Sequence, residues 1–296
     1  MPKRWDTDTR APVTGCAIEL RRRGPMKNRI VIYHGHCLDG FTAAWAAWLN
    51  PLWRDAEFLP ASYGSPPPAV DDCMTLVVDF SYPRDVMLDM KRRASGLSVL
   101  DHHKTAQAAL DGLDFASFDM ERSGAGMTWD ALHPGKERPW LVSYVEDRDL
   151  WRWALPQSKE VNAWVGACKR ESFEAWDRLA ATPFEKVIEK GEAVLAYIER
   201  YVSEMTEQAR TVTVAGQAVP MVNAPYICIS ELVGRLAESA PFAVGWFQRS
   251  DGLYAYSLRS RGSEGVDVSE IAKRYGGGGH RNSAGFTLTE LLPEGN

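Results

Sequence analysis

The chain of 296 residues is long enough for two domains of ordinary size, and its 45% hydrophobic and 25% charged residues are typical of a soluble globular protein. The formal net charge of −5 argues against broad electrostatic binding to duplex DNA. Five widely spaced cysteines without a CxxC pair predict reduced thiols rather than a disulfide framework. No apolar run approaches the ~20 residues that span a bilayer, and the N-terminus has no apolar signal core, so we expect a cytoplasmic protein.

The first 26 residues differ in composition from the rest of the chain. They carry six Lys or Arg residues against three acidic ones and show little hydrophobic periodicity. Two interpretations fit this composition: a disordered basic arm, or a start assigned too early, with Met26 as the true first residue.

Strands and helices are predicted to alternate after this segment. Apolar, β-rich runs predict strands at 29–33, 75–78 and 97–100, and helices are predicted at 41–49 and from Pro83 to about residue 93. This alternation is typical of βαβ units and a mainly parallel sheet. From about residue 124 the pattern is helical and ends in a long helix over about 184–210, in which Gly191 is expected to cost stability.

The last 85 or so residues predict a second, smaller α/β module. The predicted strands cover 211–214, 218–223, 242–247, 253–258 and 284–288, and the predicted helices cover 230–238 and 266–275. The expected fold is therefore α/β, with an N-terminal, mainly parallel sheet flanked by helices, a linking helix, and a smaller C-terminal α/β domain.

Five of the six histidines fall in three short clusters beside aspartate or glycine. These clusters are His34-Gly-His36-Cys-Leu-Asp39, Asp101-His102-His103, and the glycine run 276–279 that precedes His280. The predicted strands end at such polar residues, and sites in open α/β sheets form beyond the carboxyl ends of the strands. Imidazole beside carboxylate suits Mn, Fe, Co or Zn, and glycine N–H groups can hold an anion. The pattern indicates a metal-assisted enzyme acting on a phosphate-bearing substrate.

In this order, the motifs resemble those of the DHH phosphoesterase superfamily, in the subset that carries a C-terminal DHHA1 domain. The segment from His34 to Asp39-Gly40 resembles the first metal motif, and Asp79 resembles the second. Asp101-His102-His103 is the signature that names the family, and Asp147 resembles the fourth motif. The stretches 257–260 and 276–285 resemble the DHHA1 substrate motif. The resemblance implies a DHH catalytic domain at 27–183, a linking helix at 184–210 and a DHHA1 substrate-binding domain at 211–296.

The resemblance also implies two divalent metal ions, with Mn expected and Co, Zn, Fe or Mg as alternatives. Two such ions ~3.5–4 Å apart lower the pKa of a bound water and clamp the phosphoryl group. The implied metal ligands are His34, His36, Asp39, Asp79, Asp101, His102 and Asp147, with Asp79 as the bridge. His103 is the expected acid for the leaving group, and Asp101 either binds metal directly or orients an imidazole. The expected substrate-binding residues are Arg259, Gly277, Gly278, Gly279 and His280.

The first motif departs from the family pattern. Cys37 stands where the family usually has an aspartate, and His34 is shifted by one position. Either His36 or a Cys37 thiolate can replace the missing ligand, and we favour His36 because imidazole suits every candidate metal. Asp149 is the most ambiguous acid: it is either a surface or capping residue of the fourth motif or, as the less favoured alternative, a direct metal ligand.

The leading hypothesis is a phosphodiesterase or phosphomonoesterase for short oligonucleotides, dinucleotides or 3′-phosphoadenosine 5′-phosphate. The negative charge of the chain fits a small nucleotide or short oligonucleotide better than a long polymer, and we expect no duplex DNA or membrane as partner. The resemblance also makes a homodimer plausible. The alternatives are a phosphoanhydride hydrolase acting on polyphosphate or pyrophosphate, and a nucleotide-binding sensor that has lost one metal.

Overall fold

A computed structural model describes residues 28–262 and 265–292 of the chain. The expectations for the N-terminal arm concern residues 1–26 and lie outside the described residues. Within the described part, no helix combines the length and the apolar character that are needed to cross a bilayer.

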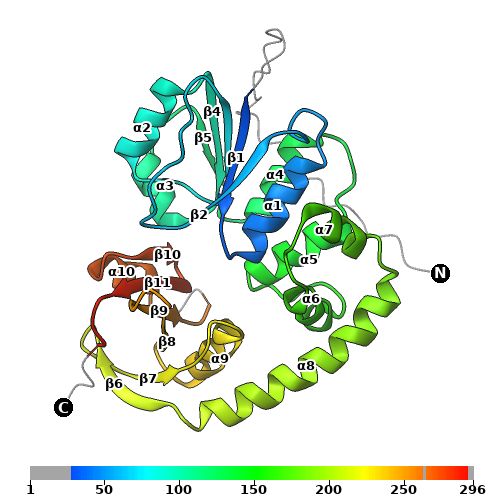
Figure 1. Ribbon diagram of the computed structural model, residues 1–296. Helices are drawn as coiled ribbons and strands as arrows, with labels where there is room; N and C mark the ends of the chain where they lie inside the picture. Colours follow the sequence, from blue (N-terminus) through cyan, green and yellow to red (C-terminus); the bar gives the residue numbers. More distant parts are fainter. Residues whose placement is uncertain (1–27, 263–264, 293–296) are drawn as a thin grey trace.

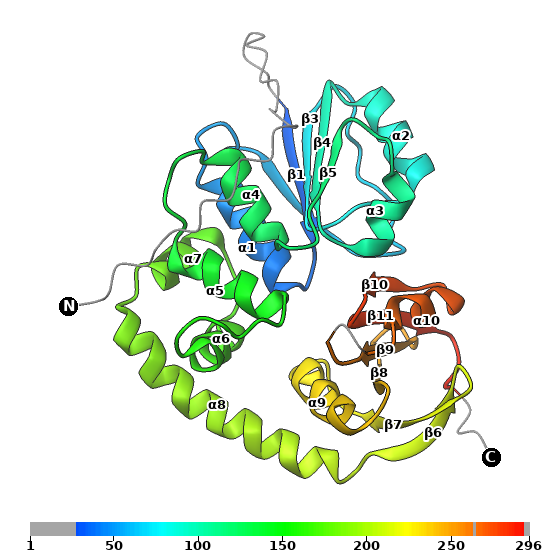
Figure 2. The same ribbon diagram turned by 180° about the vertical axis from the view of Figure 1, so that it is seen from behind.

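The N-terminal part is built on a sheet of five parallel strands in the order β2-β1-β3-β4-β5. The strands are β1 (Arg29–His34), β2 (Glu57–Ala61), β3 (Met74–Val78), β4 (Gly96–Asp101) and β5 (Ala116–Phe118). The helices around them are α1 (Leu38–Trp48), α2 (Arg84–Arg93), α3 (Lys104–Leu110) and α4 (Gly124–Leu132). Figures 1 and 2 show α1 and α4 on one face of this sheet and α2 and α3 on the other.

Alternating side chains along each strand supply the two faces of this sheet. Val31 and Leu76 pack toward α1 and α4, whereas Ile32 and Val77 pack toward α2 and α3. Because both faces are covered, the strands are continuous apolar runs, which is why the sequence predicts β1, β3 and β4. It does not predict the two edge strands: β2 contains Pro60, which is tolerated only at an edge, and β5 has three residues.

A helical segment connects the two sheets. It consists of α5 (Trp140–Asp149), α6 (Ser158–Ala167), α7 (Phe173–Ala180) and α8 (Phe184–Thr206). Helix α8 is 23 residues long and runs from the N-terminal part to the C-terminal module, as Figures 1 and 2 show. The helix ends at Thr206, about one turn before the predicted end.

The C-terminal module contains a mixed six-stranded sheet in the order β10-β11-β9-β8-β7-β6. Its strands are β6 (Arg210–Val214), β7 (Gln217–Asn223), β8 (Ala243–Gln248), β9 (Tyr254–Arg259), β10 (Gly278–His280) and β11 (Ser283–Leu288). Helix α9 (Ile229–Leu236), followed by the 3₁₀ helix η1 (Ala237–Ser239), packs on one face together with the end of α8. Helix α10 (Val268–Arg274) packs on the other face. The glycine run, which carries no strand in the sequence analysis, contributes β10.

The C-terminal module folds back so that it lies against the carboxyl edge of the parallel sheet. Lys104 Nζ at the start of α3 donates to Asp267 Oδ2 at 2.5 Å, and Arg148 donates to Glu231 at 2.7 Å. A Cβ added to Gly278 would lie 2.9 Å from the Thr105 hydroxyl, so β10 contacts α3 directly. Residues from both parts of the chain therefore face the same region.

Helix α8 depends on a glycine where it packs on α6. A Cβ added to Gly191 would lie 2.0 Å from the carbonyl oxygen of Glu160. From the sequence alone, Gly191 is expected only to weaken the helix; the structure shows that the packing of α8 on α6 needs a glycine there. A Cβ added to the exposed Gly166, also in a helix, meets nothing within 4 Å.

We expect Gly191→Ala to lower the free energy of unfolding by about 1–3 kcal/mol, because the added methyl forces two packed helices apart. Gly166→Ala should raise it by about 0.4–1 kcal/mol, because alanine reduces the entropy of the unfolded chain. Urea unfolding of both variants measures the difference. Equal stabilisation by the two substitutions would contradict the observed packing of α6 and α8.

Candidate metal centre

Asp79 lies at the centre of the polar cluster at the carboxyl edge of the parallel sheet. It follows β3, is buried, and its backbone has a φ of 54°, a left-handed conformation that is uncommon for a residue other than glycine. Its Oδ1 lies 3.1 Å from His102 Nε2, and its Oδ2 lies 3.5 Å from His34 Nδ1. The turn after β3 thus places one carboxylate between two imidazoles from neighbouring strands.

Three carboxylates surround the His102 ring. Its Nε2 lies 3.6 Å from Asp39 Oδ2 and 3.4 Å from Asp149 Oδ2, in addition to the contact with Asp79. Asp39 is held in place by two backbone N–H groups at the start of α4, those of Gly124 at 2.6 Å and Ala125 at 3.0 Å. The carboxylates of Asp39 and Asp149 therefore approach one imidazole from different elements.

Gly124 is a residue that the sequence analysis missed. A Cβ at this position would lie 2.4 Å from Asp79 Cβ and 2.9 Å from Asp39 Oδ2, so only glycine lets α4 approach the two carboxylates. The available signal was Ser123, whose side chain caps α4, followed by small residues.

Asp101, at the end of β4, organises the two histidines that follow it. Its Oδ1 accepts the backbone N–H groups of His102 at 2.7 Å and His103 at 3.2 Å, and it lies 2.7 Å from His103 Nδ1. The carboxylate therefore orients the His103 ring, and its second oxygen is buried without a hydrogen-bond partner among the described residues.

Four overlapping groups of side chains, each with ligand atoms within 4.8 Å of one another, have the composition of metal sites. These are His34, Cys37 and Asp79; Asp39, His102 and Asp149; Asp79, Asp101 and His103; and His102, His103 and His280. Several atoms in them are buried without a hydrogen-bond partner in the described part of the chain, namely His34 Nδ1, Asp79 Oδ2, Asp101 Oδ2, His102 Nδ1 and Asp149 Oδ2. Because buried polar atoms are normally paired, these orphaned ligand atoms fit divalent cations.

The pKa values of the cluster reflect an excess of buried negative charge. Burial and the charges of Asp79 and Asp149 raise the pKa of Asp39 well above its usual range. Burial opposes ionisation of Asp79, but the hydrogen bond from His102 and the nearby His34 and His102 rings outweigh it and hold its pKa well below the usual range. Burial likewise disfavours the His102 cation, but the surrounding carboxylates raise its pKa to about 10. A cluster that draws positive charge in this way suits a divalent cation.

The structure places Asp147 apart from the four ligand groups. Its buried carboxylate accepts the N–H groups of Ala154 at 3.0 Å and Leu155 at 3.4 Å, together with the Ser158 hydroxyl. Asp147 thus holds the turn between α5 and α6 and belongs to none of the four ligand groups found in the described residues. Asp149, for which the sequence leaves a capping role and a metal role open, lies with Asp39 and His102 instead.

Of the two candidate replacement ligands, His36 and Cys37, the structure brings Cys37 to the cluster. His36 is exposed, its φ is 59°, and its carbonyl oxygen accepts a hydrogen bond from the Tyr226 hydroxyl at 2.7 Å. Cys37 lies with His34 and Asp79. Burial and the nearby charges of Asp79, Asp149 and Asp39 raise the pKa of the Cys37 thiol well above its usual value, so a bound cation is needed to hold it as a thiolate.

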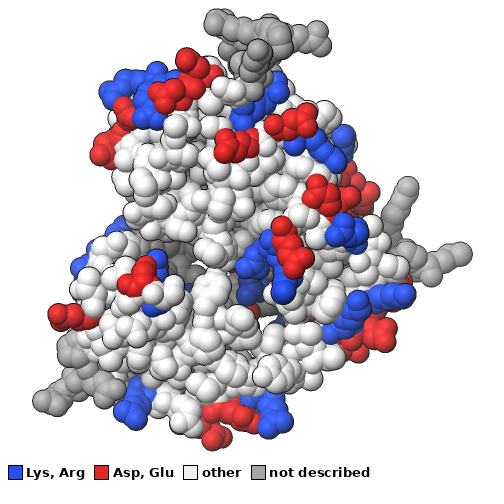
Figure 3. Space-filling model, in the orientation of Figure 1, with Lys and Arg blue, Asp and Glu red and all other residues white. Residues whose placement is uncertain are grey.

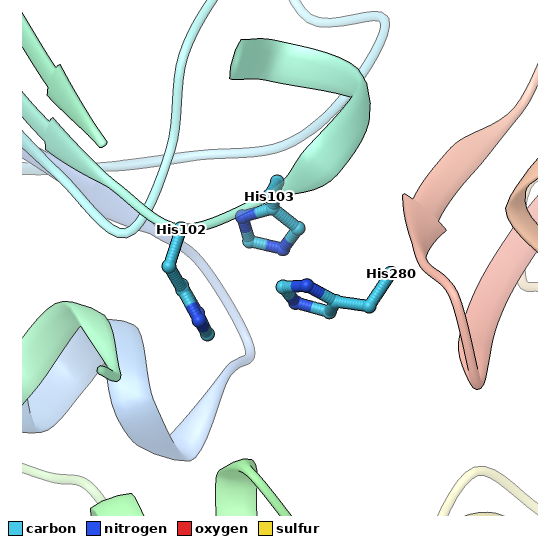
Figure 4. Close-up of side chains that lie close together, drawn as sticks. All are labelled: His102, His103 and His280. Atoms are coloured by element: carbon cyan, nitrogen blue, oxygen red, sulfur yellow. The ribbon is translucent and has the colours of Figure 1, made fainter. Parts of the chain in front are cut away.

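The C-terminal module contributes His280 to the cluster. The His280 ring stacks on His103 with centroids 4.5 Å apart and lies 4.6 Å from His102, and Figure 4 shows it reaching across from the opposite module. Burial, together with the neighbouring His103 and His102, holds the pKa of His280 well below its usual value. His280 is therefore a neutral imidazole with the chemistry of a ligand or hydrogen-bond partner.

The other predicted substrate-binding residues are mainly held by protein contacts. Arg259 is half-buried and donates to the Ser230 hydroxyl at 2.7 Å and to the Leu258 carbonyl at 2.8 Å. Added Cβ atoms at Gly277 and Gly279 would clash with the backbone of β11, and the Gly279 N–H donates to Thr105 at 3.4 Å. In this structure the glycine run serves close packing against β11 and α3.

Asp147→Ala should mainly lower the stability of the protein, whereas Asp149→Ala should mainly weaken its binding of metal. Loss of the Asp147 carboxylate leaves buried donors unpaired and should lower the free energy of unfolding of metal-free protein by about 3 kcal/mol. Loss of the Asp149 carboxylate removes like-charge repulsion and should change stability by less than about 1 kcal/mol while weakening Mn²⁺ binding. Urea unfolding and calorimetric metal titration measure the two effects. Weaker metal binding with unchanged stability in Asp147→Ala would contradict the reassignment.

Comparison with known proteins identifies relatives along most of the chain. Residues 219–295 match the family model of the DHHA1 domain. The chain is 29% identical over 288 residues to the uncharacterized protein R106 of Acanthamoeba polyphaga mimivirus, covering 88% of this chain and 68% of that protein. It is 27% identical over 220 residues to the oligoribonuclease NrnB of Bacillus subtilis, covering 67% of this chain and 54% of that protein.

Solved structures with similarity to this chain include the pGpG-specific phosphodiesterase PggH from Vibrio, with 12% identity, a TM-score of 0.48, and coverage of 88% of this chain and 93% of that chain. They also include RecJ from Thermus thermophilus in complex with Mn²⁺, with 16% identity and a TM-score of 0.46. That match covers 88% of this chain and 49% of the RecJ chain. With its DHHA1 match, its relatives and its ordered motifs, the chain belongs to the DHH phosphoesterase superfamily and carries a C-terminal DHHA1 domain.

Proposed function

We propose that this protein is a divalent-metal-dependent phosphoesterase that hydrolyses phosphodiester or phosphomonoester bonds of small nucleotides. The observation that carries the proposal is the position of Asp79 between two sets of ligand atoms. His34 and Cys37 lie on one side of its carboxylate, and His102 with Asp39 and Asp149 lies on the other. A shared carboxylate of this kind is what a two-metal site requires.

The grouping of the ligand atoms indicates which residues would hold each ion. His34, Cys37 and Asp79 would hold one, and Asp39, His102 and Asp149, with Asp79 as the bridge, would hold the other. When bound, two divalent ions supply a hydroxide at neutral pH and neutralise charge on the phosphoryl oxygens. Because one set includes a thiol, that position suits softer cations such as Zn or Fe better than an all-carboxylate site would.

His103 is placed to handle the proton of the leaving group. Asp101 lies 2.7 Å from its Nδ1, so that nitrogen carries a proton and Nε2 is the atom that exchanges a proton with the substrate. Burial opposes the cationic form, but Asp101 and Asp79 raise the pKa of His103, so the ring holds a proton near neutral pH. Asp101 acts through His103 as a positioning residue.

The C-terminal module would bind the rest of the substrate. Burial lowers the pKa of Arg259 to about 10, which leaves the guanidinium charged at neutral pH and available to a phosphate. His280 already lies at the metal cluster. We therefore propose that residues 27–183 form the catalytic domain and 211–296 the substrate-binding domain, with 184–210 linking them. The relative named oligoribonuclease supports a short oligonucleotide or dinucleotide as substrate.

The first test is hydrolysis of the dinucleotide pApA by metal-stripped protein with Mn²⁺, Co²⁺, Zn²⁺ or Mg²⁺ added back. We expect metal-dependent release of mononucleotide. Asp79→Asn should reduce kcat/KM by more than ~100-fold, since even residues that only orient metal ligands contribute ~10–100-fold. Asp55→Asn, at an exposed position outside the cluster, is the matched control.

Turnover of polyphosphate with none of pApA would replace this proposal with a phosphoanhydride hydrolase. Nucleotide binding without turnover in any metal would indicate a sensor.

The role of Cys37 has a spectroscopic test that does not depend on activity. Binding of Co²⁺ should produce thiolate-to-cobalt charge-transfer absorption in the near ultraviolet, because the bound cation deprotonates the thiol. Cys37→Ser should abolish this absorption, whereas Cys228→Ser should retain it. Cys37→Asp should keep metal binding but shift the preference from Zn²⁺ toward Mn²⁺. Full charge-transfer intensity in Cys37→Ser would exclude the thiolate ligand.

A further inference from the structure

A cavity of about 530 Å³ opens beside the first-motif loop, within the range of ~300–1,000 Å³ that is usual for ligand sites. Four segments of the sequence line it, of which Pro60 of β2 is one. Cys37 and Phe41 come from the loop and start of α1, Lys169 and Arg170 follow α6, and Tyr226 and Ile227 precede α9. The cavity is therefore complete only when the C-terminal module lies against the N-terminal part.

The cavity and the candidate metal centre adjoin at Cys37. Cys37 lines the cavity and also lies within 4.8 Å of the ligand atoms of His34 and Asp79. A substrate whose phosphate lies at the metal centre therefore has the cavity beside it. In the face drawn in Figure 3, Lys and Arg side chains lie near the middle of the molecule with acidic side chains beside them.

One wall of the cavity offers positive charge. Arg170 is half-buried and has no ion pair with any described acidic residue. The neighbouring Lys169 approaches only Glu171, at 3.7 Å, and both of those side chains are largely exposed. In a chain with a net charge of −5, an unpaired and partly buried guanidinium at a cavity wall is suited to an anionic group of a ligand.

The other wall offers apolar and aromatic surface. Tyr226 and Ile227 are 55% and 76% exposed, which is unusual for large hydrophobic residues side by side. The Tyr226 ring is nevertheless fixed, because its hydroxyl donates to the His36 carbonyl at 2.7 Å and its edge contacts Phe247 with centroids 5.9 Å apart. An immobilised aromatic ring with a free face is what base stacking requires.

We propose that this cavity is a subsite for the second nucleotide of the substrate, with its base stacked on Tyr226 and its anionic groups paired with Arg170. The subsite rests on the proposed phosphoesterase function and narrows its substrate class. A diester that carries a nucleotide on each side of the scissile phosphate fills the cavity, whereas a phosphomonoester leaves it empty. The protein therefore acts on dinucleotides and short oligonucleotides in preference to 3′-phosphoadenosine 5′-phosphate.

The test compares two diesters that differ only in what enters the cavity: pApA, and 3′-phosphoadenosine 5′-phosphate with a methyl ester on its 3′-phosphate, in which a methyl group replaces the second nucleoside. We expect Tyr226→Leu and Arg170→Gln each to raise KM for pApA by roughly 5- to 100-fold, the factor that corresponds to ~1–3 kcal/mol for a stacked base. Hydrolysis of the methyl ester should change by less than about twofold. Tyr226→Phe, which keeps the ring but loses the bond to His36, should resemble wild type more closely than Tyr226→Leu does.

Arg178→Gln, an exposed arginine on α7, is the matched control for charge and should leave KM unchanged for both diesters. Thermal unfolding of every variant verifies that it is folded. If the variants affect both diesters equally, or neither, the subsite is excluded while the proposed function stands. If Tyr226→Phe raises KM for pApA as much as Tyr226→Leu does, the effect comes from the lost contact between the modules and not from stacking, and the subsite is again excluded. If wild-type protein hydrolyses neither diester with any metal, both proposals fail.

Discussion

Buried negative charge at one edge of a parallel sheet is the constraint around which the rest of this protein is arranged. Asp39, Asp79 and Asp101 are each at most 1% exposed, and carboxylates in such positions must be compensated. The compensation comes from many elements: backbone N–H groups at the start of α4, imidazoles after β1 and β4, and the orphaned ligand atoms that fit divalent cations. The strand order brings these groups together, because β1, β3 and β4 are adjacent in the sheet and all end at the cluster.

Close approach of backbones is the second requirement, and glycine meets it at three separate places. Gly124 brings the α4 N-terminus against Asp79, Gly191 lets α8 lie on α6, and Gly278 lets β10 reach Thr105 on α3. Each position has room for a hydrogen atom and none for a methyl group. The first assembles the cluster, the second sets the direction of the linking helix, and the third lets His280 meet His102 and His103.

Polar contacts between the modules surround the cluster on several sides. Lys104 with Asp267, Arg148 with Glu231, and the Tyr226 hydroxyl with the His36 carbonyl all join residues more than 80 positions apart. Such contacts are individually modest, since partly exposed ion pairs contribute little. Together they define an arrangement in which one substrate would meet groups from both modules at once, which is how binding energy far from the reacting bond is used to orient it.

The amino-acid sequence by itself determined the family, the α/β fold and the convergence of His34, Asp39, Asp79, Asp101 and His102, because apolar periodicity defines buried strands and polar residues at their ends share one edge. Only the tertiary structure decided which of two residues close together in the sequence lies at the cluster. Asp147 and Asp149 are two residues apart on one helix, so they point in nearly opposite directions, and packing turns Asp149 toward Asp39 and His102. His36 and Cys37 lie in a loop without hydrophobic periodicity. There His36 has a positive φ, its carbonyl oxygen contacts Tyr226 and its side chain is exposed, whereas Cys37 lies beside Asp79. Side-chain direction at such positions depends on contacts from distant segments, which no local pattern encodes.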